Sequence, residues 1–331
     1  MDIFVKSFKS IIITFSIIIL FAWISCTSVV RDSDNTKEAA WTIKMFSKDQ
    51  GNWLSVENKT LYVDFMEEWA WTIRNIRYLG DEIVGEYGAH GSVVRVDTGI
   101  GPKDYYYIGT SHGHEKVKSY SILVDGKKQQ YKSGSTCSGK KVIIRKESNL
   151  GPFDHKMEIT FPDSANYIIE KHSYKVVEDL NERFSFLFAF MHELNKEFGC
   201  WLAVLADGNE LQGDLLKREK GRISLGRDIK TVVFYSQMMK KGVTLVYPQV
   251  YKGAGKLKVE IKNGSTEHFG TSIVDMNIGN SKLYFRPEVK KKRYKVGDTF
   301  EYSIKVVPFS AEPDEWKTKG KKLAVFNTEK E

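Results

Sequence analysis

The chain has 331 residues, of which 41% are hydrophobic, 13% aromatic and 28% charged, and its formal net charge is +8. This composition excludes a disordered or collagen-like chain, because there is ample apolar material for a core. The length allows one large all-β domain or two ordinary domains.

The N-terminus has the pattern of an export signal. Lys6 and Lys9 precede an apolar run over 11–24, and Ser25 and Cys26 follow it. The run is shorter than the 18 or more apolar residues of a usual membrane span. Residues 1–25 are therefore predicted to be a lipoprotein-type signal peptide, with lipidation at Cys26. Cleavage without a lipid and a retained anchor are the alternatives.

Small and polar residues over 26–40 predict a tether between the lipid and a folded domain. The protein is then expected in the cell envelope, in the periplasm or at the outer surface. Cys137 and Cys200 would be the remaining cysteines, and they could either pair or stay as thiols.

Period-two alternation dominates from Trp41 onward and predicts strands, as in LYVDFM, YSILVDG and HKMEITF. Asp-Gly, Asn-Gly and Pro-Asp pairs between these segments are typical of tight β-connections. The segment FSFLFAFMHEL at 184–194 is apolar on both faces, which predicts one strand in the middle of a large sheet. We expect an all-β fold of two large antiparallel sheets packed face to face, over a single domain at 41–331.

Four stretches carry a resemblance to a known family. They are EEWAWTIRNIRYLGDEIVGEYGAHGSVVRV, KVIIRKESNLGPFDHKMEITFPDSANYIIEKHSYKVVED, FSFLFAFMHEL and KLYFRPEVKKKRYKVGDTFEYSIKVVPF. Together they resemble the galactose mutarotase-like β-supersandwich over most of residues 53–309. The resemblance implies a concave sheet face that receives a sugar.

The stretch YIGTSHGHEKV at 107–117 contains two histidines, His112 and His114. Mutarotases of this fold transfer protons with two histidines and a carboxylate, and histidine titrates near neutral pH. The resemblance implies that His112 or His114 and His192 are catalytic. Among the late glutamates, Glu267 is the best available candidate for the carboxylate that acts as the general base. A polar turn is the main alternative for the His-x-His segment, and a shared metal is a weaker one.

Substrate-binding residues are expected next to these histidines. Tyr105 and Tyr107 precede the turn, and Glu115 follows it directly. Glu193 adjoins His192, and because neighbours on a strand face opposite sides, one of the two faces the sugar. Trp201 is expected to be an aromatic platform for a sugar.

Other tryptophans are expected in the core rather than at the site. Trp53, Trp69 and Trp71 are predicted to pack between the sheets, since most aromatic residues are buried.

The predicted function is binding or modification of a sugar or polysaccharide by an exported protein. A mutarotase or epimerase, a polysaccharide lyase and a non-catalytic glycan-binding lipoprotein are the alternatives. The excess of basic residues fits an acidic polysaccharide, and equally a solvated face near a membrane. No cofactor, metal or nucleic acid is expected, and the membrane is a partner through the lipid anchor alone.

Overall fold

The computed structural model describes 41–48, 51–85, 93–97, 105–110, 112–113, 115–179, 183–188, 190–205, 207–216, 221–225, 229–246, 250–251, 254–255, 257–260, 266–269, 272–278, 282–287 and 294–324. The signal peptide and the tether predicted over 1–40 lie outside the described residues. One compact unit spans Ala39–Glu331.

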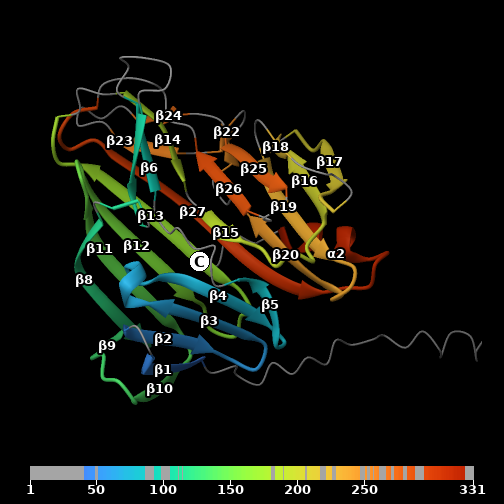
Figure 1. Ribbon diagram of the computed structural model, residues 1–331, viewed down its shortest axis with the longest axis horizontal. Coiled ribbons are helices and arrows are strands. Elements are labelled where there is room, and N and C mark those ends of the chain that lie inside the picture. Colours follow the sequence, from blue (N-terminus) through green and yellow to red (C-terminus); the bar gives the residue numbers. More distant parts are fainter. Residues whose placement is uncertain are drawn as a thin grey trace, which may run out of the picture. The chain divides into compact units, whose positions relative to one another are not determined.

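A six-stranded antiparallel sheet has the order β10-β1-β2-β3-β4-β5 (Figure 1). Its strands are β1 (Trp41–Lys48), β2 (Gly51–Glu57), β3 (Leu61–Met66), β4 (Thr72–Tyr78), β5 (Asp81–Val84) and β10 (Thr136–Gly139). The 3-10 turn η1 (Glu67–Trp69) joins β3 to β4.

A larger sheet has the order β17-β16-β19-β20-β27-β13-β12-β11-β8-β9, with the pair β23 and β24 added beside β27. Its strands are β8 (Glu115–Val124), β9 (Lys127–Gln129), β11 (Val142–Leu150), β12 (Phe153–Phe161), β13 (Ile168–Val176), β16 (Cys200–Leu205), β17 (Glu210–Asp214), β19 (Ile229–Ser236), β20 (Lys241–Val246), β23 (Leu257–Glu260), β24 (Thr266–Phe269) and β27 (Thr299–Ser310). The 12-residue β27 pairs with β13 along its first half and with β20 along its second half.

Three short sheets complete the described strands. They contain β14 (Arg183–Phe188), β6 (Val93–Asp97) and β7 (Tyr105–Gly109); β15 (Phe190–Glu193), β26 (Lys282–Pro287), β25 (Ser272–Ile278) and β18 (Gly221–Leu225); and β21 (Val250–Tyr251) with β22 (Ala254–Gly255).

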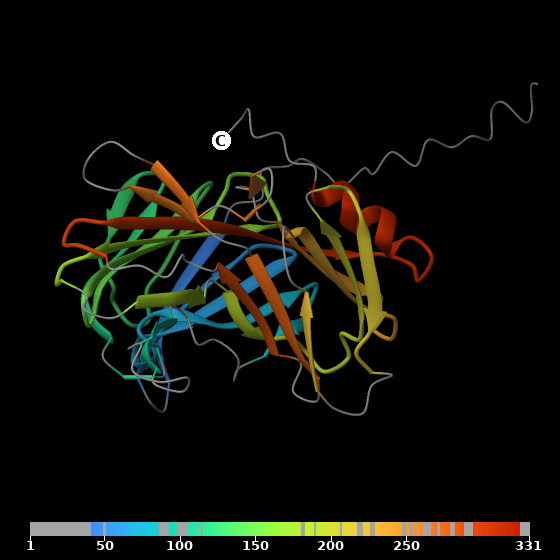
Figure 2. The same ribbon diagram turned by 90° about the horizontal axis from the view of Figure 1, so that it is seen from above.

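The core lies between the two large sheets because one face of each is apolar. Ile43 and Leu54 from the six-stranded sheet belong to the same buried cluster as Phe161 and Ile304 from the larger one. Rings of Trp41 and Phe161 meet edge to face across the gap, with centroids 5.1 Å apart. Figure 2 shows the two sheets from above. The predicted all-β class, with two antiparallel sheets face to face, is confirmed.

One expectation about an individual element was wrong, and one element was not expected. The segment FSFLFAFMHEL is not one central strand, because β14 and β15 belong to different sheets and each lies at the edge of its sheet as described. An unpredicted helix, α2 (Trp316–Ala324), covers β19 and β20 on the side away from the main core. There Trp316 stacks on Tyr235 with centroids 5.3 Å apart.

Cys137 and Cys200 are free thiols, so the alternative of a disulfide between them does not hold. Among the described residues, no helix is both long enough and apolar enough to cross a membrane.

Candidate functional site

The stretch with His112 is a closed turn between β7 and β8. The amide of His112 donates to the Gly109 carbonyl at 3.0 Å, and the Gly109 amide donates to the Gly113 carbonyl at 3.1 Å. His112 is exposed, and its ring lies 5.4 Å from that of Tyr107. His114 lies outside the described residues.

Glu115 does not face solvent, because it begins β8 with its side chain turned into the protein. The carboxylate is 4% exposed, and its Oε1 lies 2.7 Å from Nζ of the fully buried Lys146. Thr110 Oγ1 donates to Oε2 at 2.5 Å, and Ser148 Oγ donates to Oε1 at 2.9 Å. Nζ of Lys146 makes no hydrogen bond of good geometry to the described residues, so charge holds the pair.

A chain of hydrogen bonds continues from Ser148 across the next two strands. Ser148 Oγ lies 3.2 Å from Nδ1 of His155, and His155 Nε2 lies 3.2 Å from Nδ1 of His172. Nε2 of His172 lies 3.3 Å from the Glu170 carboxylate. These residues share the inward face of their strands with Met157, Ile159 and other core residues, so the network is embedded in apolar side chains.

The directions of these bonds fix where protons lie. Ser148 gives its single proton to Glu115, so Nδ1 of His155 must donate to Ser148 and Nε2 of His155 must accept. Burial, with the nearby His172 and Lys146, holds the pKa of His155 well below its usual value, which agrees with a neutral ring. His172 then donates from Nδ1, and one further proton lies between His172 Nε2 and Glu170.

Solvent does not reach this buried network. His155 is 0% exposed and His172 is 1% exposed, and their rings stack on Tyr174 and Tyr302 at 4.5 and 5.0 Å. The hydroxyls of those tyrosines lie 3.0 Å apart. The network therefore lacks access for a ligand, although it contains the imidazoles and carboxylates of acid–base chemistry.

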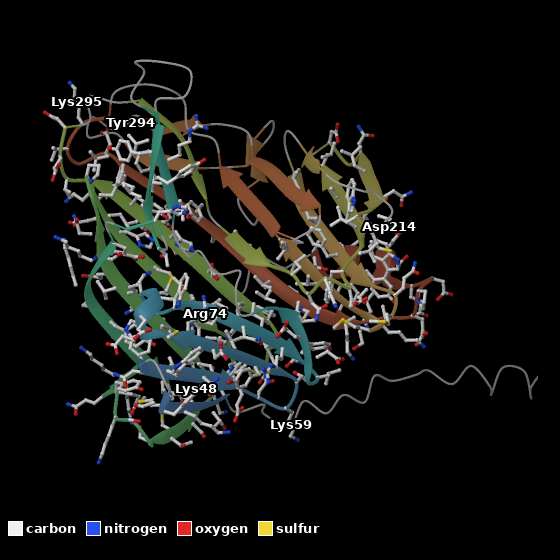
Figure 3. The ribbon with its side chains drawn as sticks, viewed as in Figure 1. Lys48, Lys59, Arg74, Asp214, Tyr294 and Lys295 are labelled. Carbon is white, nitrogen blue, oxygen red and sulfur yellow. The ribbon has the colours of Figure 1, made fainter. Side chains whose placement is uncertain are left out.

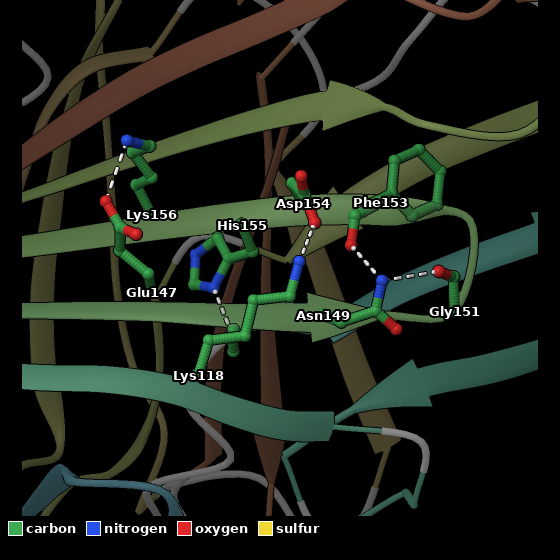
Figure 4. A network of polar contacts seen from close by, with 9 residues as sticks. Lys118, Glu147, Asn149, Gly151, Phe153, Asp154, His155 and Lys156 are labelled. Carbon is green, nitrogen blue, oxygen red and sulfur yellow. Dashed lines mark hydrogen bonds and ion pairs between the residues drawn. The ribbon is translucent and has the colours of Figure 1, made fainter.

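A hollow of about 500 Å³ lies on the other face of the same strands, and we call it the groove. Because side chains alternate along a strand, Glu147 and Asp154 point away from the core while Ser148 and His155 point into it. Figure 4 shows the ion pairs of this region. The outward side chains that line the groove are Lys118, Glu147, Asp154, Lys156, Ser173, Lys175, Thr299 and Glu301.

Strand register arranges most of these side chains in two rows. Glu147, Lys156, Ser173 and Glu301 face one another in turn across β11, β12, β13 and β27. The second row runs in the same way through Asp154, Lys175 and Thr299.

Ion pairs tie the groove together. Lys156 Nζ lies 2.7 Å from Glu147, and Lys118 from β8 lies 2.5 Å from Asp154. Lys171 pairs with Glu301. At these exposed positions such pairs contribute little to stability, typically below about 1 kcal/mol each.

The remaining predicted residues are not brought together among the described side chains. Trp201 is 5% exposed and belongs to the core, where Gly213 lies so close that an added Cβ would stand 2.8 Å from its ring. This burial favours a packing role rather than a sugar platform. The side chains of Tyr105, His192 and Glu193 lie outside the described residues, although their backbone forms β7 and β15.

Sequence reasoning missed both the buried network and the groove. The signal for the network was present, since Lys146, His155 and His172 occupy the apolar positions of alternating strands. Within the part of the chain described, no group of three His, Cys, Asp or Glu side chains could hold a metal ion.

No protein-family model matches the chain, and no curated protein matches it. Solved structures similar to it include a galactose 1-epimerase from Lactobacillus acidophilus, with a TM-score of 0.45, 10% identity, and coverage of 82% of this chain and 99% of that one. A galactose mutarotase-like protein from Lactobacillus casei has a TM-score of 0.44 and 8% identity, over 81% and 100% of the chains.

The galactosidase domain of an α-galactosidase–sucrose kinase has a TM-score of 0.48 at 6% identity, covering 81% of this chain and 42% of that one. All three TM-scores lie below 0.5, and all three identities are 10% or lower.

Proposed function

We propose that the protein binds a carbohydrate in the groove on the outward face of β8, β11, β12, β13 and β27. One observation supports this most strongly: an accessible hollow of about 500 Å³ is lined by carboxylates, ammonium groups and hydroxyls. A sugar hydroxyl both donates and accepts hydrogen bonds, so a ligand rich in hydroxyls can use every one of these groups. The volume lies within the range of small-ligand clefts, about 300–1,000 Å³.

The charges of the groove favour a neutral sugar. Its lining contains three lysines, Lys118, Lys156 and Lys175, and three carboxylates, Glu147, Asp154 and Glu301. Their formal charges cancel, so the excess of +8 over the whole chain is not concentrated here. A uronate or sulfate group in the groove would lie beside as many carboxylates as ammonium groups. The lining charges therefore do not favour an acidic polysaccharide over a neutral one.

The groove favours binding over turnover. The outward side chains of its described lining include no histidine or cysteine, whose ionisation is most easily placed near neutral pH, and the one histidine of the lining, His155, is 0% exposed. His155 and His172 belong to the buried network, on the inward face of the same strands. A mutarotase, an epimerase or a lyase would need such a group within reach of the sugar.

Isothermal titration with a panel of neutral and uronate-containing oligosaccharides tests this proposal. Glu147→Gln and Lys156→Met each remove one partner of a groove ion pair. Each is expected to lower the association constant for a neutral oligosaccharide at least about tenfold, equivalent to about 1.4 kcal/mol. The melting temperature should stay within a few degrees, because the pair is exposed.

The ion pair between Lys240 and Glu312 provides matched controls. Its charged atoms lie 2.8 Å apart at similar exposure, outside the groove lining, so Lys240→Met and Glu312→Gln should leave binding unchanged. Equal losses in the groove and control variants, or no binding of any sugar on the panel, would refute the proposal. Chemical conversion of a bound sugar would instead identify an enzyme.

We also propose that the chain is exported and anchored to a membrane through a lipid on Cys26. The support is the basic start, the apolar run over 11–24 and the Ser25–Cys26 pair. The polar segment over 27–40 would then hold the sugar-binding unit away from the lipid surface.

A further inference from the structure

A second, smaller pocket lies on the outward face of the six-stranded sheet. Its volume is about 150 Å³. The strands β1 to β4 supply its side chains, which are Phe46, Lys48, Trp53, Tyr62, Asp64, Asn75 and Arg77. Figure 3 shows Lys48 on these strands, together with Arg74. None of these residues lines the groove.

The position of Trp53 differs from the sequence expectation, which placed it between the sheets. Leu54 and Val56 of β2 belong to the main core, and alternation therefore turns Trp53 to the opposite face. Trp71 does lie in the core as expected. An indole only 7% exposed on an outward sheet face is unusual, because such a face is ordinarily solvated and polar.

Aromatic rings and cations form the walls of the pocket. Phe46 stacks beside Trp53, with centroids 6.3 Å apart and an interplanar angle of 14°. Nζ of Lys48 lies 5.6 Å from the Trp53 ring, and the Arg77 guanidinium lies 5.5 Å from the ring of Tyr62. Lys48 and Arg77 are exposed, so they stand at the rim.

Two buried polar atoms of the pocket lack a hydrogen-bond partner among the described residues. They are the Trp53 indole nitrogen, a donor, and the Asn75 side-chain oxygen, an acceptor. Asn75 is 4% exposed, and its amide nitrogen donates to Glu82 at 2.9 Å. Buried polar atoms in native proteins are nearly always satisfied, so this donor and acceptor indicate a ligand that supplies both functions.

Further hydrogen-bonding capacity surrounds these atoms. The Tyr62 hydroxyl lies 3.4 Å from a carboxylate oxygen of Asp64. Burial, and then the charge of Asp64, raise the pKa of Tyr62 to about 12, so it remains a phenol at neutral pH. The pocket therefore combines apolar ring faces with donors and acceptors at its base and cations at its rim.

We propose that this pocket is a second carbohydrate site, which holds one neutral sugar ring against Phe46 and Trp53. The C–H groups on the face of a pyranose are attracted to the negative face of an aromatic ring. Its hydroxyls can accept from the Trp53 indole and Arg77 and donate to Asn75 and Asp64. The Asp64 carboxylate disfavours an anionic ligand at the base.

The size of the pocket sets the length of the ligand. At about 150 Å³ the pocket lies below the range of about 300–1,000 Å³ that is usual for small-ligand clefts. That is room for one sugar ring or for the end of a glycan chain, but not for a disaccharide. The groove, with more than three times this volume, has no such restriction.

Crystals of the protein soaked with methyl glucoside, methyl galactoside and methyl mannoside provide the direct test. At least one of them is expected in the pocket, with its ring parallel to Phe46 or Trp53 and a hydroxyl within hydrogen-bond distance of the indole nitrogen. Crystals soaked at saturating concentration that show no sugar in the pocket would overturn the inference.

Titration in solution, followed by tryptophan fluorescence, tests the same site without a lattice. Phe46→Ala and the exposed Arg77→Met are each expected to weaken binding of the methyl glycoside at least about fivefold. Arg145→Met is the control, because the exposed guanidinium of Arg145 pairs with Glu158 on the other sheet and lines neither hollow. Unchanged affinity in both pocket variants would also overturn the inference.

The soaked crystals separate this site from the groove. Sugar in the pocket with an empty groove would uphold the second site and refute the proposed function. Sugar in the groove alone would uphold the proposed function and refute the second site.

Discussion

Lys146→Met should destabilise the protein severely, because Lys146 is fully buried and pairs with the buried carboxylate of Glu115. The variant keeps most of the side-chain volume of Lys146 and removes its charge. Glu115, which is 4% exposed, would then keep its negative charge in the core without the ammonium group 2.7 Å away. The hydrogen bonds from Thr110 and Ser148 would remain.

The expected loss is about 3–5 kcal/mol of unfolding free energy, the usual cost of removing one partner from a buried pair. At about 2 °C for each kcal/mol in a domain of this size, the melting temperature should fall by about 6–10 °C. Lys156→Met is the control, since Lys156 is 68% exposed in its pair, and its loss should cost below about 1 kcal/mol.

Urea unfolding followed by circular dichroism measures both variants. The double variant Lys146→Met with Glu115→Gln removes both charges, and it should be more stable than Lys146→Met alone. A loss below about 1 kcal/mol for Lys146→Met, or a strictly additive double variant, would refute the description of Glu115 and Lys146 as a buried, coupled pair.

Two further predictions concern the buried histidine and the N-terminus. Unfolded His155 should titrate near pH 6.5, while its folded pKa is held well below this value, so the unfolded state binds the extra proton in between. The free energy of unfolding should therefore fall as the pH decreases below about 6.5, by up to about 1.4 kcal/mol per pH unit from this residue. Urea unfolding at pH 7.5 and 5.5 should show a smaller difference for His155→Gln, and an unchanged difference would contradict the assignment. Cys26→Ala should release the protein from the membrane fraction on cell fractionation, and unchanged membrane association would exclude the lipid anchor.

The sequence was sufficient for the strands that alternate regularly. In β12, the order of His155, Met157 and Ile159 against polar neighbours gave both the strand and its inward face. The sequence was not sufficient for FSFLFAFMHEL, because two apolar faces indicate burial but do not indicate which strands lie beside the segment. Its two strands, β14 and β15, belong to different sheets. The helix α2 buries only Trp316 and Gly320 over nine residues, too little for a helical period to show.

The candidate sites were harder to predict than the fold. The groove depends on pairing of β13 with β27, which brings Ser173 beside Glu301 across more than a hundred residues. No local sequence pattern specifies the strand register between β13 and β27. The pocket depends on which face of β2 carries Trp53, and a tryptophan in a strand is assigned to the core by default.

The place of β27 in the larger sheet has a consequence for how the protein is made. The strands β8, β9, β11, β12 and β13 form one part of that sheet, and β16, β17, β19 and β20 form the other. The strand β27 follows all of them in sequence and lies between the two parts. During synthesis, the edges of β13 and β20 that pair with β27 stay unpaired until residues 299–310 have been synthesised. Such long sequence separation slows folding, and an open strand edge is a template for association with other chains. We therefore expect chains truncated before Thr299 to aggregate more readily than the full chain, because the edges of β13 and β20 stay unpaired.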